Sequence, residues 1–251
     1  MTSEQRGLTL EDFWTLKLVS DVQISPDGRT VAYVVGSYDE VHNKATSAIW
    51  LVDLDSKRAR QFSAGEAADT TPRWSRDGAR LAFVSTRHEQ KPQIYVIDRD
   101  GGEPRRITDA KDGAFGPVWS PDGRRLCYAV AVESDRQKVP AETAWLEAHK
   151  DADGNAPRMR RQATLVSRFD GRGYVDKRSH LFLIDVDTPG AEPRQLTDDD
   201  HDDTEPAWSP DGSLIAFVSN RTTDAEYNFA SDVWAADVES GALTRLTGEN
   251  L

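Results

Sequence analysis

The tetrapeptide Ser-Pro-Asp-Gly occurs at residues 25–28, 120–123 and 209–212, and a fourth copy at residues 75–78 has arginine in place of the proline. Proline sets the φ angle at the second position of a type I turn, aspartate tolerates the third, and glycine takes the position that needs a positive φ. Each copy therefore predicts a tight turn between two strands, with a bulge at the glycine.

The residues around each turn repeat as well. The position before the serine holds Ile24, Trp74, Trp119 and Trp208. Positions six, seven and eight after the serine hold an aliphatic, a small and an aromatic residue: Val31-Ala32-Tyr33, Leu81-Ala82-Phe83, Leu126-Cys127-Tyr128 and Ile215-Ala216-Phe217. Such repetition, with four short strands per ~40–45 residues, is typical of β-propeller blades. A β-sandwich also has short strands, but it lacks this repetition. The sequence therefore predicts an all-β fold, a β-propeller with four blade repeats.

The predicted organisation is an N-terminal arm over residues 1–21 and a partial propeller over residues 22–251. Within residues 8–19 the apolar spacing favours a short helix, and Thr9 with Asp12 resembles a capping box. We expect blades at about residues 22–63, 74–108, 119–197 and 208–247. Because propellers have ~4–8 blades, we expect these four to belong to a larger ring.

The third blade contains an insertion over residues 133–179, between its second and third strands. Pro140 followed by helix-forming residues predicts a helix there, and residues 150–161 read as a loop. Because insertions in a repeat emerge on one face and often build a binding surface, we expect this one to project from the blade.

Composition narrows the classes of partner. The net charge of -12 over 251 residues argues against nucleic acid or an anionic membrane as the main partner. The sequence has no apolar run of membrane-spanning length, and its polar start lacks the pattern of a secretory signal, so we expect a cytoplasmic protein. A single cysteine allows no internal disulfide.

The cysteine, the tryptophans before the turns and two arginines could serve in catalysis or ligand binding, but structural roles explain their positions better. Cys127 stands in a column of alanines, which predicts a small buried residue rather than a nucleophile. The tryptophans before the turns predict packing between blades rather than a stacking platform. Arg87 and Arg221 follow the second strand of their blades, and we favour a bond to a loop carbonyl or a nearby aspartate over a positive rim on a tunnel.

The sequence also contains possible metal ligands, but for each of them we favour a role other than metal binding. Residues 198–203 (Asp-Asp-Asp-His-Asp-Asp) offer hard oxygen ligands, but a solvated loop is the alternative that we favour. Residues 151–155 (Asp-Ala-Asp-Gly-Asn) resemble a calcium loop without its closing glutamate. The five histidines lack metal-ligand spacing and are expected to be scattered over the surface: His42, His88, His149, His180 and His201. We therefore expect no catalytic, cofactor-binding or metal-binding residue, and no cofactor.

Six stretches carry a family resemblance: residues 8–12 (Leu-Thr-Leu-Glu-Asp), 22–28, 72–75 (Pro-Arg-Trp-Ser), 85–87 (Ser-Thr-Arg), 101–108 (Gly-Gly-Glu-Pro-Arg-Arg-Ile-Thr) and 168–174 (Arg-Phe-Asp-Gly-Arg-Gly-Tyr). Over residues 8–251 the chain resembles the N-terminal propeller of serine peptidases of the prolyl oligopeptidase family, most closely the acylaminoacyl-peptidase branch. Residues 168–174 discriminate best, because TolB-type propellers share the turns but lack this stretch.

The resemblance implies a propeller of about seven blades that caps a C-terminal α/β-hydrolase domain with a Ser-Asp-His triad and admits only short peptides. This sequence has no Gly-x-Ser-x-Gly motif, so no catalytic residue of that family can be assigned to it. The first hypothesis is thus the non-catalytic propeller part of such a hydrolase, whose partners are its hydrolase domain and, through the parent enzyme, a peptide substrate.

Two other hypotheses remain. One is a free-standing propeller that binds a protein or peptide, and the other, which we favour least, is an enzyme in its own right. Blade faces without a neighbouring blade would also favour self-association, so a homo-oligomer is a further expectation.

Overall fold

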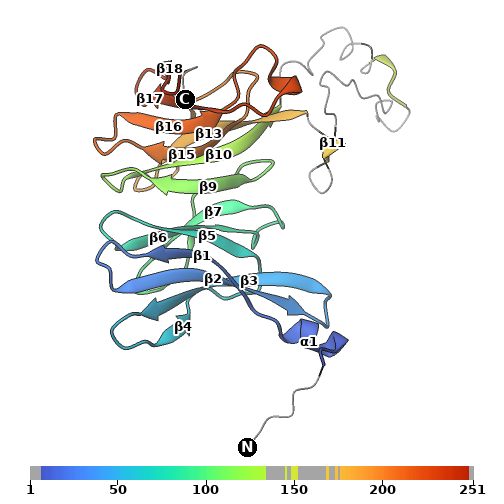
Figure 1. Cartoon of the computed structure of the whole chain (residues 1–251), viewed down its shortest axis with the longest axis vertical. Helices are drawn as coiled ribbons and strands as arrows, with labels where there is room; N and C mark the ends of the chain where they lie inside the picture. Colours follow the sequence, from blue (N-terminus) through green and yellow to red (C-terminus); the bar gives the residue numbers. More distant parts are fainter. Residues whose placement is uncertain are drawn as a thin grey trace, which may run out of the picture. The chain divides into compact units, whose positions relative to one another are not determined.

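The computed structural model describes residues 7–133, 145, 148–151, 168–169, 173–174 and 176–248. These residues form four four-stranded antiparallel sheets and little helix (Figure 1), so the predicted all-β fold and its four repeats are confirmed. In the first, second and fourth sheets the strands lie in chain order, and in the third the order β14-β13-β10-β9 also follows the chain.

The strands have the following bounds. The first sheet holds β1 (Leu18–Ile24), β2 (Thr30–Asp39), β3 (Lys44–Asp53) and β4 (Ala59–Gln61). The second holds β5 (Asp69–Trp74), β6 (Arg80–Ser85), β7 (Gln93–Asp98) and β8 (Arg105–Arg106). The third holds β9 (Ala114–Trp119), β10 (Arg125–Glu133), β13 (Lys177–Asp185) and β14 (Arg194–Gln195). The fourth holds β15 (Asp203–Trp208), β16 (Leu214–Ser219), β17 (Asp232–Asp237) and β18 (Leu243–Arg245).

Each predicted turn closes a hairpin between the first two strands of its sheet. In the first copy the Ser25 hydroxyl donates to the Asp27 carboxylate at 2.5 Å and accepts the Thr30 N–H at 3.0 Å. The glycines of all four turns have the expected positive φ: Gly28 (71°), Gly78 (70°), Gly123 (71°) and Gly212 (74°). The serine hydroxyl thus ties the turn aspartate to the start of the second strand.

A second repeated feature is a bulge in the first strand of each sheet. Four residues before the turn serine, the backbone takes a left-handed φ at Asp21 (45°), Thr71 (56°), Gly116 (58°) and Glu205 (53°). The strand register shifts at this point in the first, second and fourth sheets. Only one of the four residues is glycine, so the other three occupy a conformation that costs a side-chain-bearing residue energy.

Some predicted boundaries differ from the structure. β1 begins at Leu18, not residue 22, because Leu18 and Val19 pair with Gly36 and Val35 beyond the bulge. The first blade therefore includes residues that we assigned to the arm. The insertion ends earlier than predicted, because β13 begins at Lys177.

The short segments fit their predictions where the structure describes them. Helix α1 spans Leu10–Thr15, and the backbone N–H of Thr9 donates to the Asp12 carboxylate at 2.8 Å, as in a capping box. Of the helix predicted after Pro140, Trp145 and Ala148 are helical, and most of the rest lies outside the described residues. In the resemblance stretch 168–174, β11 (Arg168–Phe169) pairs with β12 (Gly173–Tyr174).

The chain divides into two compact units, residues 1–128 with 183–193 and residues 129–182 with 194–251. The core of the first unit is a cluster contributed by the first two sheets: Ala32, Ile49, Leu51, Leu81, Phe83, Tyr95 and Ile97, with Phe62 and Trp74 at its margin. Strands β2, β3, β6 and β7 supply the buried members, as expected for inner strands covered on both faces.

Candidate functional site

The most buried carboxylate of the described part of the first unit, Asp69, forms a salt bridge with Arg87 at one end of the second sheet, and we call this pair a lock. Asp69 is the first residue of β5 and its side chain is 1% exposed. Arg87, two residues beyond β6, donates from Nη2 to both Asp69 carboxylate oxygens at 3.0 Å and from Nε to the Ser85 hydroxyl at 2.9 Å. Its guanidinium also lies 4.9 Å from the ring centre of Tyr95. The interpretation that Arg87 binds a nearby aspartate is confirmed.

The fourth sheet has an equivalent lock in the second unit. Arg221 donates from Nη2 to Asp203 at 2.7 Å and also pairs with Asp199. His180, at the centre of β13, places Nδ1 3.4 Å from the other Asp203 oxygen. His180 is only 4% exposed, so the expectation that all five histidines lie on the surface is wrong for this one. Asp203 holds it inside the sheet.

The protonation of Asp203 follows from these partners. Burial alone would raise the pKa of this carboxyl. Hydrogen bonds with His180 and Thr197 and the positive charge of Arg221 outweigh burial and hold the pKa of Asp203 below its usual value. Asp203 is therefore a carboxylate near neutral pH, and it serves as the anion of an ionic network.

Two further acids of the run 198–203, Asp200 and Asp202, have a cationic partner in Arg178. Arg178 lies 3.2 Å from Asp200 and 3.6 Å from Asp202, and the Asp202 carboxylate also accepts the Ser179 N–H at 2.8 Å. Over the part of the chain that the structure describes, no three His, Cys, Asp or Glu side chains come together as metal ligands. Of the resembled calcium loop 151–155, residues 152–155 lie outside the described residues.

The lone thiol has no nucleophilic setting. Cys127 is fully buried in β10, and burial raises the pKa of its thiol. A thiolate nucleophile needs the opposite shift and access to substrate. The prediction of a small buried strand residue is confirmed.

Polar clamps join neighbouring sheets of the first unit. The Trp74 indole N–H donates to the Gln23 carbonyl at 3.2 Å, and the Trp119 N–H donates to the Arg73 carbonyl at 2.9 Å. Arg99 crosses from the second sheet to the Asp27 carboxylate of the first turn at 2.7 Å. The prediction that these tryptophans pack between blades is confirmed for Trp74 and Trp119.

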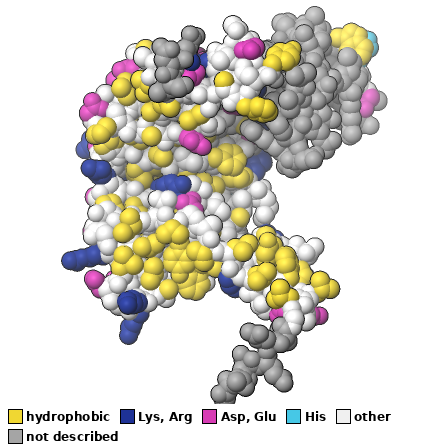
Figure 2. All heavy atoms as spheres, viewed as in Figure 1, with side chains coloured by type: hydrophobic (Ala, Val, Ile, Leu, Met, Phe, Trp, Pro, Cys, Tyr) yellow, Lys and Arg dark blue, Asp and Glu magenta, His cyan; other side chains and the backbone are white. Residues whose placement is uncertain are grey.

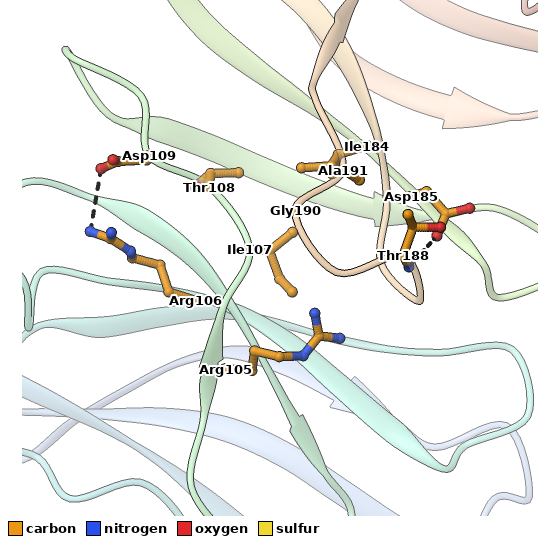
Figure 3. A pocket seen from close by; sticks show the side chains of 10 residues that line it. All are labelled: Arg105, Arg106, Ile107, Thr108, Asp109, Ile184, Asp185, Thr188, Gly190 and Ala191. Carbon is orange, nitrogen blue, oxygen red and sulfur yellow. Dashed lines mark hydrogen bonds and ion pairs between the residues drawn. The ribbon is translucent and has the colours of Figure 1, made fainter.

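The hollow in Figure 3 lies where one such clamp is made. It encloses about 230 Å³ between β8 and the turn after β13. Arg105 at its edge donates to the Val186 carbonyl at 2.7 Å, and Arg106 pairs with Asp109 at 3.3 Å. A second hollow of about 460 Å³ lies beside Arg60, the residue of the first sheet equivalent to Arg105, which donates to the Arg99 carbonyl. Each hollow thus lies beside an arginine that joins neighbouring sheets.

The locks could have been found by comparing the repeats with one another. Aspartate six residues before the turn serine occurs together with arginine twelve residues after it in the second and fourth copies. The first and third copies lack both, with Val19 and Ser37 in one and Ala114 and Val132 in the other. Because the aspartate and the arginine are either both present or both absent in each repeat, the sequence indicates that they contact each other.

Comparison with known proteins gives the same fold. Residues 18–149 match the family model described as PD40, the TolB β-propeller domain. The chain is 30% identical over 227 residues to an uncharacterised peptidase, YuxL, of Bacillus subtilis, covering 90% of this chain and 33% of that protein. It is 27% identical over 258 residues to dipeptidyl-peptidase 5 of Porphyromonas endodontalis, covering 98% of this chain and 36% of that protein.

Comparison with a solved peptidase structure also supports the propeller-like fold. The chain superposes on acylaminoacyl peptidase of Pyrococcus horikoshii with a TM-score of 0.68 at 20% identity, covering 94% of this chain and 33% of that one. The chain thus spans about a third of the length of the curated relatives it matches, and the expected resemblance to peptidase propellers is confirmed. The family match covers more than half of the chain, which therefore belongs to the PD40 family of TolB β-propeller domains.

Proposed function

We propose that this chain is the non-catalytic propeller part of a serine peptidase of the acylaminoacyl-peptidase type. The observation that carries the proposal is the match to a bacterial peptidase over 90% of this chain but 33% of the peptidase. A propeller module that occupies one part of a longer hydrolase would give such a match. The stretch 168–174, which discriminates this branch from TolB propellers, supports the same assignment.

The chemistry of the chain supports a non-catalytic role. The 251 residues hold no Gly-x-Ser-x-Gly motif, the only thiol is buried, and the buried His180 is held by Asp203. Hydrolysis would belong to a C-terminal α/β-hydrolase domain. The propeller would restrict its substrates to short or N-acylated peptides.

The direct test is the natural polypeptide. Antibodies raised against residues 1–251 would capture it from the cells that make it, and a fluorophosphonate probe would report a reactive serine. We expect a polypeptide roughly three times as long as this chain, as for its relatives, that carries the label. A protein of 27.9 kDa without label would contradict the proposal.

Activity of the isolated chain gives a second test. Purified 1–251 should not hydrolyse acyl-amino-acid or peptidyl substrates. Turnover that survives repurification and is blocked by a serine-directed phosphonate would show that the chain is itself catalytic.

The gating role needs its own measurement, in the full-length enzyme. Trp74→Ala would loosen the packing between the first two sheets, so the ratio of kcat/KM for long over short peptides should rise. Val41→Lys, in the exposed turn after β2, is the matched control and should leave that ratio unchanged. An unchanged ratio in both variants would argue against gating by these sheets.

The second candidate is a free-standing propeller that binds a protein or peptide. The description of the matching family as a TolB domain favours it. The capture experiment separates the two candidates, because a free-standing propeller would appear as a short, unlabelled protein that brings another protein with it.

A further inference from the structure

The hollow of about 460 Å³ between the first and second sheets is lined on one side by strands β3 and β4. Leu51 and Asp53 of β3 line it, and the residues opposite them in the β3–β4 hairpin are Arg60 and Arg58. Residues that lie opposite each other, or two apart along one strand, share a face of the sheet. Both guanidinium groups therefore leave the first sheet on the side of the hollow.

The second sheet forms the other wall with Arg99 and Asp100, directly after β7. Arg99 already has a partner, since it donates to the Asp27 carboxylate at 2.7 Å. Asp53 has partners as well, because its carboxylate accepts the N–H and the hydroxyl of Ser56, both at 2.7 Å. Two of the charged groups in the hollow are therefore used by the fold itself.

Comparison of the repeats shows that two arginines of the hollow are not used in this way. Arg105, the equivalent of Arg60 in the second sheet, donates to a backbone carbonyl at 2.7 Å, whereas Arg60 reaches its carbonyl only at 3.4 Å. The usual range for such a bond is ~2.7–3.2 Å. Arg58 has no counterpart, because the same position holds Glu103 in the second sheet and Glu192 in the third. The first sheet thus brings two weakly bonded guanidinium groups to one hollow.

Asp100 lacks a cation for a related reason. Its equivalent after β13 is Asp187, which pairs with Arg80 of the second sheet at 2.5 Å. The first sheet has Thr30 at the position of Arg80, so Asp100 has no such arginine opposite it. Among the residues that the structure describes, Asp100 forms no ion pair with the two weakly bonded arginines, although all three line the same hollow. Opposite charges therefore face one space without neutralising each other.

The inner part of the hollow is apolar. Leu51, which lines it, is 3% exposed and belongs to the core cluster. Figure 2 shows Lys and Arg side chains beside the hydrophobic side chains of the first sheet. The volume of the hollow falls within the ~300–1,000 Å³ of sites that hold small molecules. The hollow thus offers cationic, anionic and apolar surfaces to a single small ligand.

We propose that this hollow binds a free α-amino acid with an apolar side chain. The guanidinium groups of Arg58 and Arg60 hold the carboxylate, since the donors of arginine match the geometry of a carboxylate. Asp100 holds the α-ammonium group, and Leu51 contacts the side chain. A zwitterion satisfies both signs of charge at once, whereas phosphate would meet the Asp100 carboxylate and a cation would meet two arginines.

Titration calorimetry of purified 1–251 with L-leucine tests the proposal. We expect saturable binding that weakens as salt is raised, because the charged contacts are exposed to solvent. Leucinamide lacks the carboxylate and N-acetyl-leucine lacks the ammonium group, so each should bind at least about tenfold more weakly than leucine. A chain that does not bind leucine, or that binds all three compounds equally, would overturn the proposal.

Two substitutions assign each end of the ligand to a residue. Arg58→Gln should weaken leucine binding at least about tenfold and leave leucinamide binding nearly unchanged, because leucinamide has no carboxylate to lose. Asp100→Asn should weaken the binding of leucine but not that of N-acetyl-leucine. Asp55→Asn, at the position of the first sheet equivalent to Asp100, and Arg76→Gln, in the turn of the second sheet, lie outside the hollow and should bind leucine like the wild-type chain.

All four substituted residues are exposed, so the variants should fold, and far-UV circular dichroism checks this. If Arg58→Gln weakens leucine and leucinamide equally, or if either control loses leucine binding, the ligand lies elsewhere and the proposal is wrong. The function proposed above does not depend on either result, because it is tested on the natural polypeptide and not by amino-acid binding.

Discussion

The first and second sheets share one strand order and one turn, but they differ on one face, which we call the leading face. It is formed by Leu81, Phe83, Tyr95 and Ile97 in the second sheet and by Val31, Tyr33, Trp50 and Val52 in the first. In the second sheet this face is buried, its Trp74 and Arg99 donate to the sheet before it, and a buried Asp69–Arg87 pair closes one end. In the first sheet the corresponding positions hold apolar or uncharged residues and the face is half-exposed. The repeated strand sequence is therefore sufficient to form a sheet. Polar side chains at its edge, such as Trp74 and Arg99, are present where a second sheet packs against it.

The difference extends to strand length. In the second and fourth sheets the second strand ends two residues before the arginine of the lock, at Ser85 and Ser219. In the first sheet, where Ser37 stands in place of the arginine, β2 continues to Asp39. An arginine that folds back onto a buried aspartate turns the chain away from the strand, and a residue without that charge lets the strand run on.

The largest expected contrast is in core packing. Phe83→Ala should lower the unfolding free energy by about 3–5 kcal/mol, because it empties a fully buried position between the two sheets. Tyr33→Ala, at the same position of the first sheet, should cost clearly less because its ring is half-exposed. Urea denaturation of 1–251 measures both, and equal losses would show that the two faces are equally covered.

The lock gives the next largest effect. Arg87→Ala leaves the Asp69 carboxylate buried without its cation, which should cost about 3 kcal/mol, the lower end of the range for such pairs, since Arg87 is partly exposed. Ser37→Ala, the matched change in the first sheet, should stay within about 1 kcal/mol. If Arg87→Ala unfolds at the wild-type urea midpoint, the lock does not stabilise the second sheet.

Two substitutions at the bulge, Thr71→Gly and Gly116→Ala, should change the stability in opposite directions. Thr71 holds a left-handed φ of 56°, so Thr71→Gly should relieve strain and stabilise by up to about 1 kcal/mol, net of the extra flexibility of glycine. Gly116 has a φ of 58° with open space around its Cα, so Gly116→Ala should destabilise by about 1 kcal/mol through backbone strain alone. Thermal unfolding would show shifts of opposite sign, and shifts of the same sign would contradict the strain argument.

The pH dependence extends the comparison to the fourth sheet. The pKa of Asp203 is lowered in the folded chain, so its stabilisation is present above the unfolded value of about 3.9 and is lost as pH falls through the folded pKa. Asp203→Asn should reduce the difference in unfolding free energy between neutral pH and pH values below about 4. An unchanged difference would mean that other carboxyls account for acid unfolding.

The turns, the inner strands and the burial of Cys127 could be predicted because each follows from local sequence that repeats four times. The bulge could not, since Asp21, Thr71, Gly116 and Glu205 share no side-chain type, and threonine and glutamate do not favour a left-handed φ. His180 was missed for a similar reason. Its burial depends on Asp203, which lies 23 residues away in the chain and comes beside it only through the strand order.

The half-exposed leading face of the first sheet is the central structural claim, and native-state thiol labelling tests it most directly. Cys127 is buried and should stay silent, so Val31→Cys and Leu81→Cys each report one equivalent position of the two sheets. In dilute solution we predict that Val31→Cys reacts roughly a hundredfold faster or more, because Leu81→Cys must wait for the sheets to open. Protection of Val31→Cys equal to that of Leu81→Cys at high dilution would contradict the claim, since the face would then be covered within a single chain.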